Sequence, residues 1–313
     1  MTSPPVDQGH GPPLDGFGVE GLATDATGNI VLTAQFLNFV DFGNGRLESA
    51  PGNDEEVVAA FLPSGAVHWT HPIGGRINLA NPSVAPSGEV FISGSFAGTL
   101  TDLGPPLSST NGAAVVARLR ASDGQTTWAQ AFEGASAETM TVSATNSRIV
   151  VAGSFTGTIH LGPNVFTSPA GVFSAYLLEI APDGSFRAAQ SLISSAPGTV
   201  FGGLTLDAQG NVTSALTIGI LAGSVTIGAQ TFSVDGLTSI FAAQFGPDLG
   251  KTNWVERYTP NGSTASITLA QSDGGRLVVA GTFRPTARFS SDSSFSFTSI
   301  DPWSEAFVAS LVP

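Results

Sequence analysis

The histidines are the first residues to test for chemistry, because imidazole titrates near neutral pH and is a common metal ligand. The chain has four of them: His10, His68, His71 and His160. His68 and His71 have the spacing of a metal-binding pair, but two residues three apart on a β-strand point to opposite faces of the sheet. We therefore predict that both are strand residues near a sheet edge. His160 lies in a segment that varies between repeats and is a candidate ligand-binding residue.

Three acidic segments could hold a cation. Residues 25–29 (Asp-Ala-Thr-Gly-Asn) and 207–211 (Asp-Ala-Gln-Gly-Asn) look like the start of calcium-binding loops. They lack the alternating carboxylates and the terminal bidentate Glu of such loops, so we predict tight turns in which Asp and Asn side chains bond to the backbone. Residues 53–56 (Asn-Asp-Glu-Glu) are the densest acidic cluster, and we interpret them as a solvated hairpin tip. No catalytic residue, metal or cofactor is predicted.

The tryptophans could serve either ligand binding or packing between repeats. Trp69, Trp128 and Trp254 each follow a glycine by four residues. A repeated aromatic could bind one sugar per repeat, as in a lectin, but it could equally pack one repeat on the next. Packing is favoured, because the tryptophan recurs together with the fold. Trp303 departs from this pattern, and with Asp301 it completes the candidate ligand-binding residues, the third being His160.

Five repeats position these residues, near 20–76, 77–136, 137–199, 200–263 and 264–313. Each repeat opens with a short apolar strand and a polar turn, and a second strand follows. A small variable hairpin, a third strand and a fourth strand complete the unit, and no helical periodicity is sustained. Repeats of about 60 residues with four strands predict an all-β fold, a five-bladed β-propeller with four-stranded blades. The second strands end on bulky residues that we expect to be buried between blades: Phe36, Phe96, Phe155, Ile218 and Phe283.

The two ends of the chain define the expected domain and its closure. Residues 1–13 are predicted to be a flexible Pro/Gly-rich N-terminus, and 14–313 a single β-propeller domain. Repeat five offers only three strands, and an open sheet edge invites association. We therefore predict that residues 14–20 pair with residues 306–311 and close the ring.

Composition excludes several partners. With 24 acidic and 11 basic residues the formal net charge is −13 and the sequence pI is about 4.4, so the chain repels phosphate backbones and nucleic-acid binding is not expected. No apolar run approaches the roughly 20 residues that span a bilayer, so membrane insertion is not expected either. The sequence has no cysteine and only 11% charged residues. The low charge and the Ser/Thr/Gly-rich all-β pattern favour a secreted or cell-surface monomer whose signal peptide is absent from this sequence.

Residues 92–99 (Ile-Ser-Gly-Ser-Phe-Ala-Gly-Thr) and 152–158 (Ala-Gly-Ser-Phe-Thr-Gly-Thr) carry a family resemblance. Together with the Asp-Phe-Gly and Phe-Val-Ala-x-Leu segments, they resemble bacterial β-propeller repeats of the SBBP type. Such repeats are common in large extracytoplasmic proteins of myxobacteria and their relatives. The resemblance covers nearly the whole chain. It implies the fold and an extracellular bacterial setting, but it implies no activity.

The function that the sequence favours is a non-catalytic extracytoplasmic scaffold that binds a protein or a carbohydrate through its loops. One alternative is a lectin with one site per blade. Another is a lyase or hydrolase with its site at the central channel. The enzyme is disfavoured, because the histidines are scattered and Lys251 is the only lysine.

Overall fold

The computed structural model describes residues 16–134, 140–145, 147–195, 200–207, 209–218, 223–234, 239–258, 264–271, 277–283, 286–288, 296–298 and 305–311. All regular elements in these ranges are β-strands. Near-continuous runs of Val, Ile, Leu, Ala and Phe form the central strands, a pattern typical of strands that pack on both faces. Since the described residues contain no helix, none of them forms a helix that could cross a membrane.

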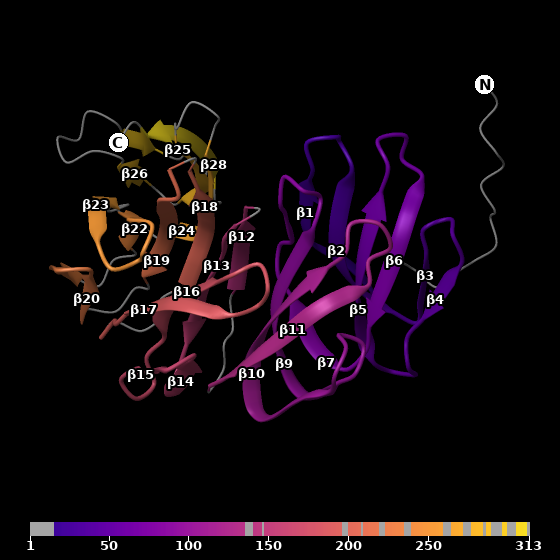
Figure 1. Ribbon diagram of the computed structural model, residues 1–313. Helices are drawn as coiled ribbons and strands as arrows, with labels where there is room; N and C mark the ends of the chain where they lie inside the picture. Colours follow the sequence, from indigo (N-terminus) through magenta and orange to yellow (C-terminus); the bar gives the residue numbers. More distant parts are fainter. Residues whose placement is uncertain are drawn as a thin grey trace.

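Each repeat folds into one antiparallel sheet (Figure 1). Blade 1 has the order β1-β2-β5-β6, from strands β1 (Phe17–Thr24), β2 (Ile30–Leu37), β5 (Asp54–Phe61) and β6 (Val67–Ile73). Blade 2 contains β7 (Arg76–Leu79), β8 (Ser83–Val84), β9 (Val90–Leu100), β10 (Leu107–Leu119) and β11 (Thr126–Glu133). Its first strand is split, because β7 and β8 both pair with β9.

The next two blades repeat the four-stranded order. Blade 3 is β12 (Met140–Ala144), β13 (Ile149–Phe155), β16 (Ser174–Ile180) and β17 (Phe186–Leu192). Blade 4 is β18 (Val200–Leu206), β19 (Val212–Ile218), β22 (Ser239–Phe245) and β23 (Thr252–Tyr258). The fifth repeat forms a three-stranded sheet from β24 (Thr264–Gln271), β25 (Leu277–Phe283) and β28 (Glu305–Leu311).

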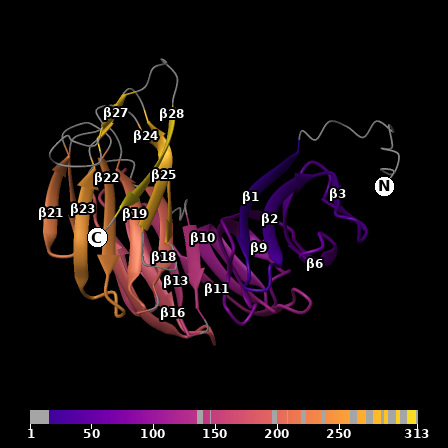
Figure 2. The same cartoon turned by 90° about the horizontal axis from the view of Figure 1, so that it is seen from above.

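The sheets follow one another around an arc, as Figure 2 shows. Their first strands are neighbours in sequence order: β1 lies beside β8, β8 beside β12, β12 beside β18, and β18 beside β24. This is a β-propeller-like arrangement of four blades. The prediction of five four-stranded blades is wrong, because the described part of the fifth repeat supplies three strands to its sheet.

The predicted ring closure is also wrong. Residues 17–19 belong to β1 and pair with β2 in the register Phe17↔Phe36 to Val19↔Ala34, and the amide of Leu37 donates to the carbonyl of Gly16 at 2.6 Å. The strand partner of β28 among the described residues is β25. Residues 16–20 therefore start the first blade, because pairing with the adjacent strand needs only a short turn.

A small hairpin follows the second strand of each repeat, as the sequence predicts. Separate hairpins are formed by β3 (Phe39–Asp41) with β4 (Arg46–Glu48), β14 (Thr158–Leu161) with β15 (Asn164–Thr167), β20 (Gly223–Ile227) with β21 (Gln230–Val234), and β26 (Thr286–Arg288) with β27 (Ser296–Thr298). In blade 2 the hairpin is the extension of β9 and β10. The hairpins of blades 3 and 4 reach the preceding blade through the bridges Gly134↔Ile159 and Ser194↔Val225.

The core lies between blades. Phe36, Phe96 and Phe155 are 0%, 3% and 0% exposed, so these members of the bulky series are buried. Phe36, however, packs within blade 1 against Val40 and Leu47 of its own hairpin, and not between two blades as predicted. The side chains of Ile218 and Phe283 lie outside the described residues. Phe96 packs in the cluster between blades 1 and 2, and Phe155 in the cluster between blades 2 and 3. Burying side chains between sheets is what holds the blades in order.

Candidate functional site

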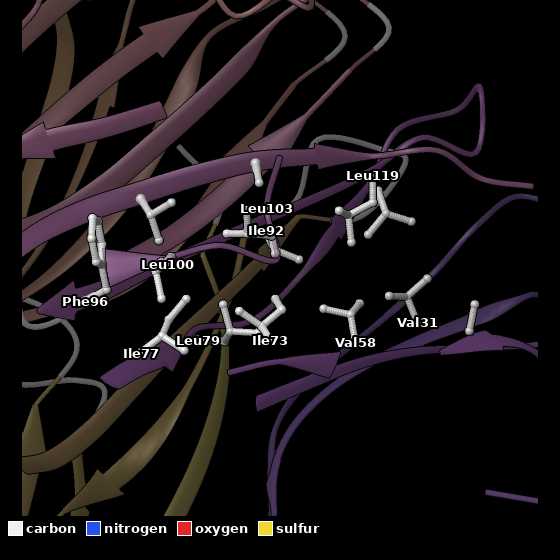
Figure 3. Close-up of a cluster of buried hydrophobic side chains, with 14 of the residues drawn as sticks. Val31, Val58, Ile73, Ile77, Leu79, Ile92, Phe96, Leu100, Leu103 and Leu119 are labelled. Atoms are coloured by element: carbon white, nitrogen blue, oxygen red, sulfur yellow. The ribbon is translucent and has the colours of Figure 1, made fainter. Parts of the chain in front are cut away.

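The interface between blades 1 and 2 is built on aliphatic side chains (Figure 3). Blade 1 contributes Val31, Val58 and Ile73, and these side chains face Ile77, Leu79 and Ile92 of blade 2. β7 is the element in contact, because it packs against both β2 and β5. The position of β7 therefore sets the spacing of the two blades.

A cleft of about 780 Å³ opens at the hairpin end of this interface. Both blades line it, with polar residues, glycines and a few apolar residues. The lining residues are Gln35, Gly52, Asn53, Asp54, Gly75, Arg76, Ile77, Asn78, Ser95, Phe96, Ala97, Thr110, Asn111, Gly112 and Ala113.

The polar residues of the lining are mostly neutral. Four residues with carboxamide side chains line it from separate segments: Gln35 of β2, Asn53 just before β5, Asn78 of β7 and Asn111 of β10. A carboxamide both donates and accepts, so it suits a ligand rich in hydroxyl groups. Asp54 and Arg76 add one charge of each sign, so that the charged residues of the lining cancel.

Asn111 is presented by an irregularity in β10. The β9–β10 register shifts between Ser109 and Ala113, and Gly112 has a φ of +89°. A side chain would strain that backbone, so glycine is required to turn the segment. The bulge places residues 110–112 on the rim of this cleft and on the rim of a second one.

The second cleft lies between blades 2 and 3 and is smaller, about 370 Å³. His160 is an exposed residue of the β14–β15 hairpin, in register with Val165, and it lines this cleft together with Glu133 and Thr158. The structure thus places this predicted site residue on a cleft. The other two, Asp301 and Trp303, lie outside the described residues.

Glu56 is a residue that the sequence analysis misplaced. Residues 53–56 were interpreted as a solvated tip, but β5 begins at Asp54 and Glu56 is 0% exposed. Glu56 faces blade 2, pairs in register with Gln35 of the cleft wall, and lies two residues from Asp54 on the same face of β5. The sequence alignment of the third strands began at Val57 in the first repeat. Extending it by one residue toward the N-terminus would have included Glu56 in the strand.

The environment of Glu56 disfavours its charge. The pKa of this carboxyl is raised to about 7: burial is the largest cause, the Leu79 amide offsets part of it, and the charges of Glu20 and Asp54 add to it. Neither carboxylate oxygen accepts a hydrogen bond of normal geometry. A buried carboxylate without a hydrogen bond of normal geometry is costly, so Glu56 is mainly protonated at pH values below about 7.

The other histidine predictions concern β6. In this strand His71 faces blade 2 with Trp69, while His68 points to the opposite side and is exposed. His71 Nε2 lies 3.0 Å from the carbonyl oxygen of Asp102. Burial lowers the pKa of His71, and the carbonyl and the carboxylate of Asp102 oppose that effect. Among the described residues no group of three His, Asp or Glu side chains is placed to hold a metal ion.

Two of the three repeated tryptophans pack one blade against the next, as predicted. Trp69 is 6% exposed, and its Nε1 donates to the carbonyl of Ala121 in the next blade at 2.9 Å. Trp128 Nε1 donates to the carbonyl of Pro182 in the next blade at 2.9 Å. Both indoles are therefore committed to contacts within the protein.

The calcium-like segments are turns, which confirms the prediction. Asp25 Oδ1 accepts hydrogen bonds from the amides of Thr27 and Asn29 at 2.8 and 2.9 Å. Asp207 Oδ1 accepts in the same way from Asn211 at 2.7 Å. These carboxylates are occupied by backbone donors at the turn end of the blades, the end away from the hairpins.

No family model matches the sequence, and no curated relative was found. Among solved structures, a protein of unknown function from Dyadobacter fermentans is similar at 14% identity and TM-score 0.47, over 90% of this chain and 83% of that one. A subtype N11 neuraminidase-like protein of a bat influenza A virus is similar at 9% identity and TM-score 0.42, over 95% and 93%. At these values the likenesses do not distinguish one function from another.

Proposed function

We propose that this chain is a non-catalytic binding protein whose main ligand site is the cleft between blades 1 and 2. The observation that carries the proposal is the lining: four carboxamides from four segments, and nearby hydroxyl and glycine backbone groups, converge on about 780 Å³. A volume of this size suits a small ligand. Neutral donors and acceptors favour a polyhydroxylated ligand, so carbohydrate is the ligand class that we propose.

The lectin with one site per blade is the second candidate, and one observation favours it. A cleft occurs at the hairpin end of two successive interfaces, and both clefts share residues 110–112. The repeated Trp69 and Trp128 do not serve such sites, because they pack between blades. Under this alternative the smaller cleft with His160 would bind the same sugar.

A lyase or hydrolase is a third candidate. The observation in its favour is the raised pKa of Glu56, since such carboxyls often act as acids or bases. A general acid must reach its substrate, and Glu56 is 0% exposed beneath the cleft wall. Binding without catalysis therefore fits the geometry better.

A glycan array tests the proposal. The wild-type protein should bind a set of glycans, and Gln35→Ala with Asn78→Ala should abolish that binding while the fold is retained. His160→Ala is the matched control, because it changes only the second cleft. If His160→Ala removes binding as strongly as the double variant, the one-site-per-blade lectin is the better account. If no glycan binds and a protein partner is captured instead, the carbohydrate class is wrong.

We propose secretion or cell-surface display for the same protein, as a monomer. The support is the low content of charged residues, the Ser/Thr/Gly-rich all-β pattern and the resemblance to SBBP-type repeats. Light scattering coupled to size-exclusion chromatography tests the monomer, and fractionation of the producing cells tests the location.

A further inference from the structure

Glu56 breaks a rule that the other repeats obey. The register of the second and third strands aligns Glu56 with one residue in each of the other sheets, and all of these are apolar: Ala114, Ala175, Ile240 and Ala306. A fold that accepts alanine or isoleucine at this position has no structural need for a carboxylate. Because a buried, unpartnered carboxylate lowers stability, its presence points to a role other than packing.

None of the described charged residues near Glu56 forms an ion pair that would stabilise its ionised form. Glu20 of β1 and Asp54 of β5 repel a negative charge there. From β7, the Leu79 amide is the one group that favours the charge. Arg76 of β7 lines the cleft beside Asp54, and the structure records no ion pair between Arg76 and Glu56.

His71 is a second titratable group in the same interface, and it responds to pH in the opposite sense. It lies two residues from Ile73, the β6 partner of Glu56. The Asp102 carboxylate accepts from the amide of Gly74 at 2.9 Å, so the hairpin of blade 2 covers the end of β6. The corresponding residues of blades 2 and 3 are the neutral Gln130 and Gln190. Protonation of His71 places a charge in a partly buried contact, which acid conditions would loosen.

β7 connects these groups to the cleft. Arg76, Ile77 and Asn78 line the cleft, and the next residue, Leu79, provides the amide at Glu56. A ligand that bridges Gln35 of blade 1 and Asn78 of blade 2 needs β7 in place. Burial is the main obstacle to ionisation of Glu56, so the ionised carboxylate is stabilised when β5 and β7 separate and water reaches it. The two walls of the cleft then separate as well, so protons and ligand favour the same closed arrangement.

We propose that the cleft between blades 1 and 2 is a proton-controlled binding site, closed in a pH range bounded above by ionisation of Glu56 and below by protonation of His71. This inference rests on the proposed ligand site and adds its regulation. Binding is strongest in weakly acidic to neutral solution, and it declines on both sides.

Hydrogen–deuterium exchange of the ligand-free protein tests the closed range directly. We compare wild type, Glu56→Gln and His71→Gln at the same pH, at about pH 5, 6.5 and 8, which bracket the ordinary pKa of His and the raised pKa of Glu56. Opening of the interface should return the raised pKa of Glu56 toward its ordinary value. At the highest pH, Glu56→Gln should therefore slow exchange in β7 by up to about tenfold for each unit by which that pKa falls on opening. At the lowest pH, His71→Gln should slow exchange there instead.

Glu179→Gln is the matched control, because it changes a paired carboxylate in the interface between blades 3 and 4. It should leave exchange in β7 unchanged at every pH. If wild type and Glu56→Gln show the same exchange in β7 at the highest pH, the proposal is overturned.

The glycan array, repeated at the same pH values, supplies the second readout. Wild-type signal should fall at the highest pH, and Glu56→Gln should keep it; a signal that falls equally in both overturns the regulation while leaving the binding site intact. If no glycan binds at any pH but exchange follows the expected pattern, the carbohydrate ligand is wrong and the proton-controlled closure stands.

Discussion

The interface between blades 3 and 4 and the interface between blades 1 and 2 both bury a carboxylate on the third strand, but at opposite ends. Glu179 of blade 3 lies at the turn end, where Arg148 donates to its two oxygens at 2.9 and 2.8 Å. Arg148 also donates to the backbone carbonyls of Gly210 and Pro247 in blade 4. Glu56 of blade 1 lies at the hairpin end, where neither of its oxygens accepts a hydrogen bond of normal geometry and the Leu79 amide is the one group that favours its charge.

Blade 2 shows which of these is the usual arrangement. Its residue in register with Glu179 is Arg118, which pairs with Glu89 at 2.9 Å and donates to the carbonyl of Pro182 in blade 3. The sign of the charge is reversed, but the carboxylate–guanidinium pair is kept. Blade 1 has Ala60 at this position. Charge at the turn end thus ties blades together, and the unpaired charge at the hairpin end of blade 1 does not.

The largest expected effect comes from breaking the paired site. Arg148→Met leaves Glu179 buried beside Arg187 alone, whose Nη1 lies 3.5 Å away. The free energy of unfolding should fall by about 3–5 kcal/mol, because the buried charge of Glu179 keeps only the longer contact to the partly exposed Arg187. Urea denaturation at neutral pH measures this. The double variant Arg148→Met with Glu179→Met should recover most of the loss. A loss of under about 1 kcal/mol in the single variant would show that the pair does not hold the blades.

Neutralising the unpaired site should have the opposite sign. In the folded protein the pKa of Glu56 is raised from 4.5 to about 7. Between these values the folded state holds a proton that the unfolded state has lost, so this group costs stability as pH rises. The cost is complete above pH 7. Glu56→Gln should therefore stabilise the protein by about 3 kcal/mol at pH 8 and hardly at all below pH 4.5.

Denaturation curves at several pH values check this prediction. The exposed Glu256 of blade 4 offers the control, since Glu256→Gln should show no such dependence. A gain from Glu56→Gln that is equal at all pH values would mean that shape, and not charge, causes it.

The contrast between the two sites also explains what the sequence could predict. The repeat register, the strand order within each unit and the burial of Phe36, Phe96 and Phe155 follow from recurring apolar residues and turns, which local physics determines. The number of complete blades depends on which strand pairs with which across the ring, and that is not a local property. The ring closure by residues 14–20 failed for this reason.

The candidate site was predicted less well than the fold. The cleft depends on neutral residues such as Asn78 and Asn111, which look like ordinary surface residues until two blades bring them together. Glu56 was misread because three neighbouring polar residues outweighed its place in the strand alignment. Only the comparison with Ala114 and Ala175 at the same register shows that it is out of place.

A third prediction sharpens the role of the turn end in blades 1 and 2. Gly124 has a φ of +70°, and a Cβ added there would lie 2.3 Å from the Trp69 ring. Gly65 holds the same turn position in blade 1 with a φ of +83°, and nothing lies within 4 Å of its added Cβ. Gly65→Ala should cost about 1–2 kcal/mol from backbone strain alone. Gly124→Ala should cost about 1–3 kcal/mol more, because the indole must move.

Thermal denaturation of the two variants, with tryptophan fluorescence as a second probe, separates strain from the clash. Only Gly124→Ala should alter the emission of Trp69. If both variants lose the same stability, the indole contact contributes little to the joining of blades 1 and 2.

The smallest effect is expected at a buried hydroxyl in the interface between blades 2 and 3. Tyr176 is 0% exposed, burial raises the pKa of its hydroxyl, and the oxygen has no hydrogen-bond partner. The register places Phe241 of blade 4 at the same position. Tyr176→Phe keeps the ring contact with Phe155, whose centroid is 6.3 Å away, and removes an unsatisfied polar group. The free energy of unfolding should therefore stay the same or rise by about 1 kcal/mol. Unlike the effect of Glu56→Gln, this effect should not depend on pH between 5 and 8. A loss of more than about 1 kcal/mol in urea denaturation would mean that a buried water molecule bonds to the hydroxyl. Tyr176 would then not be an unsatisfied polar group, and its comparison with Glu56 would fail.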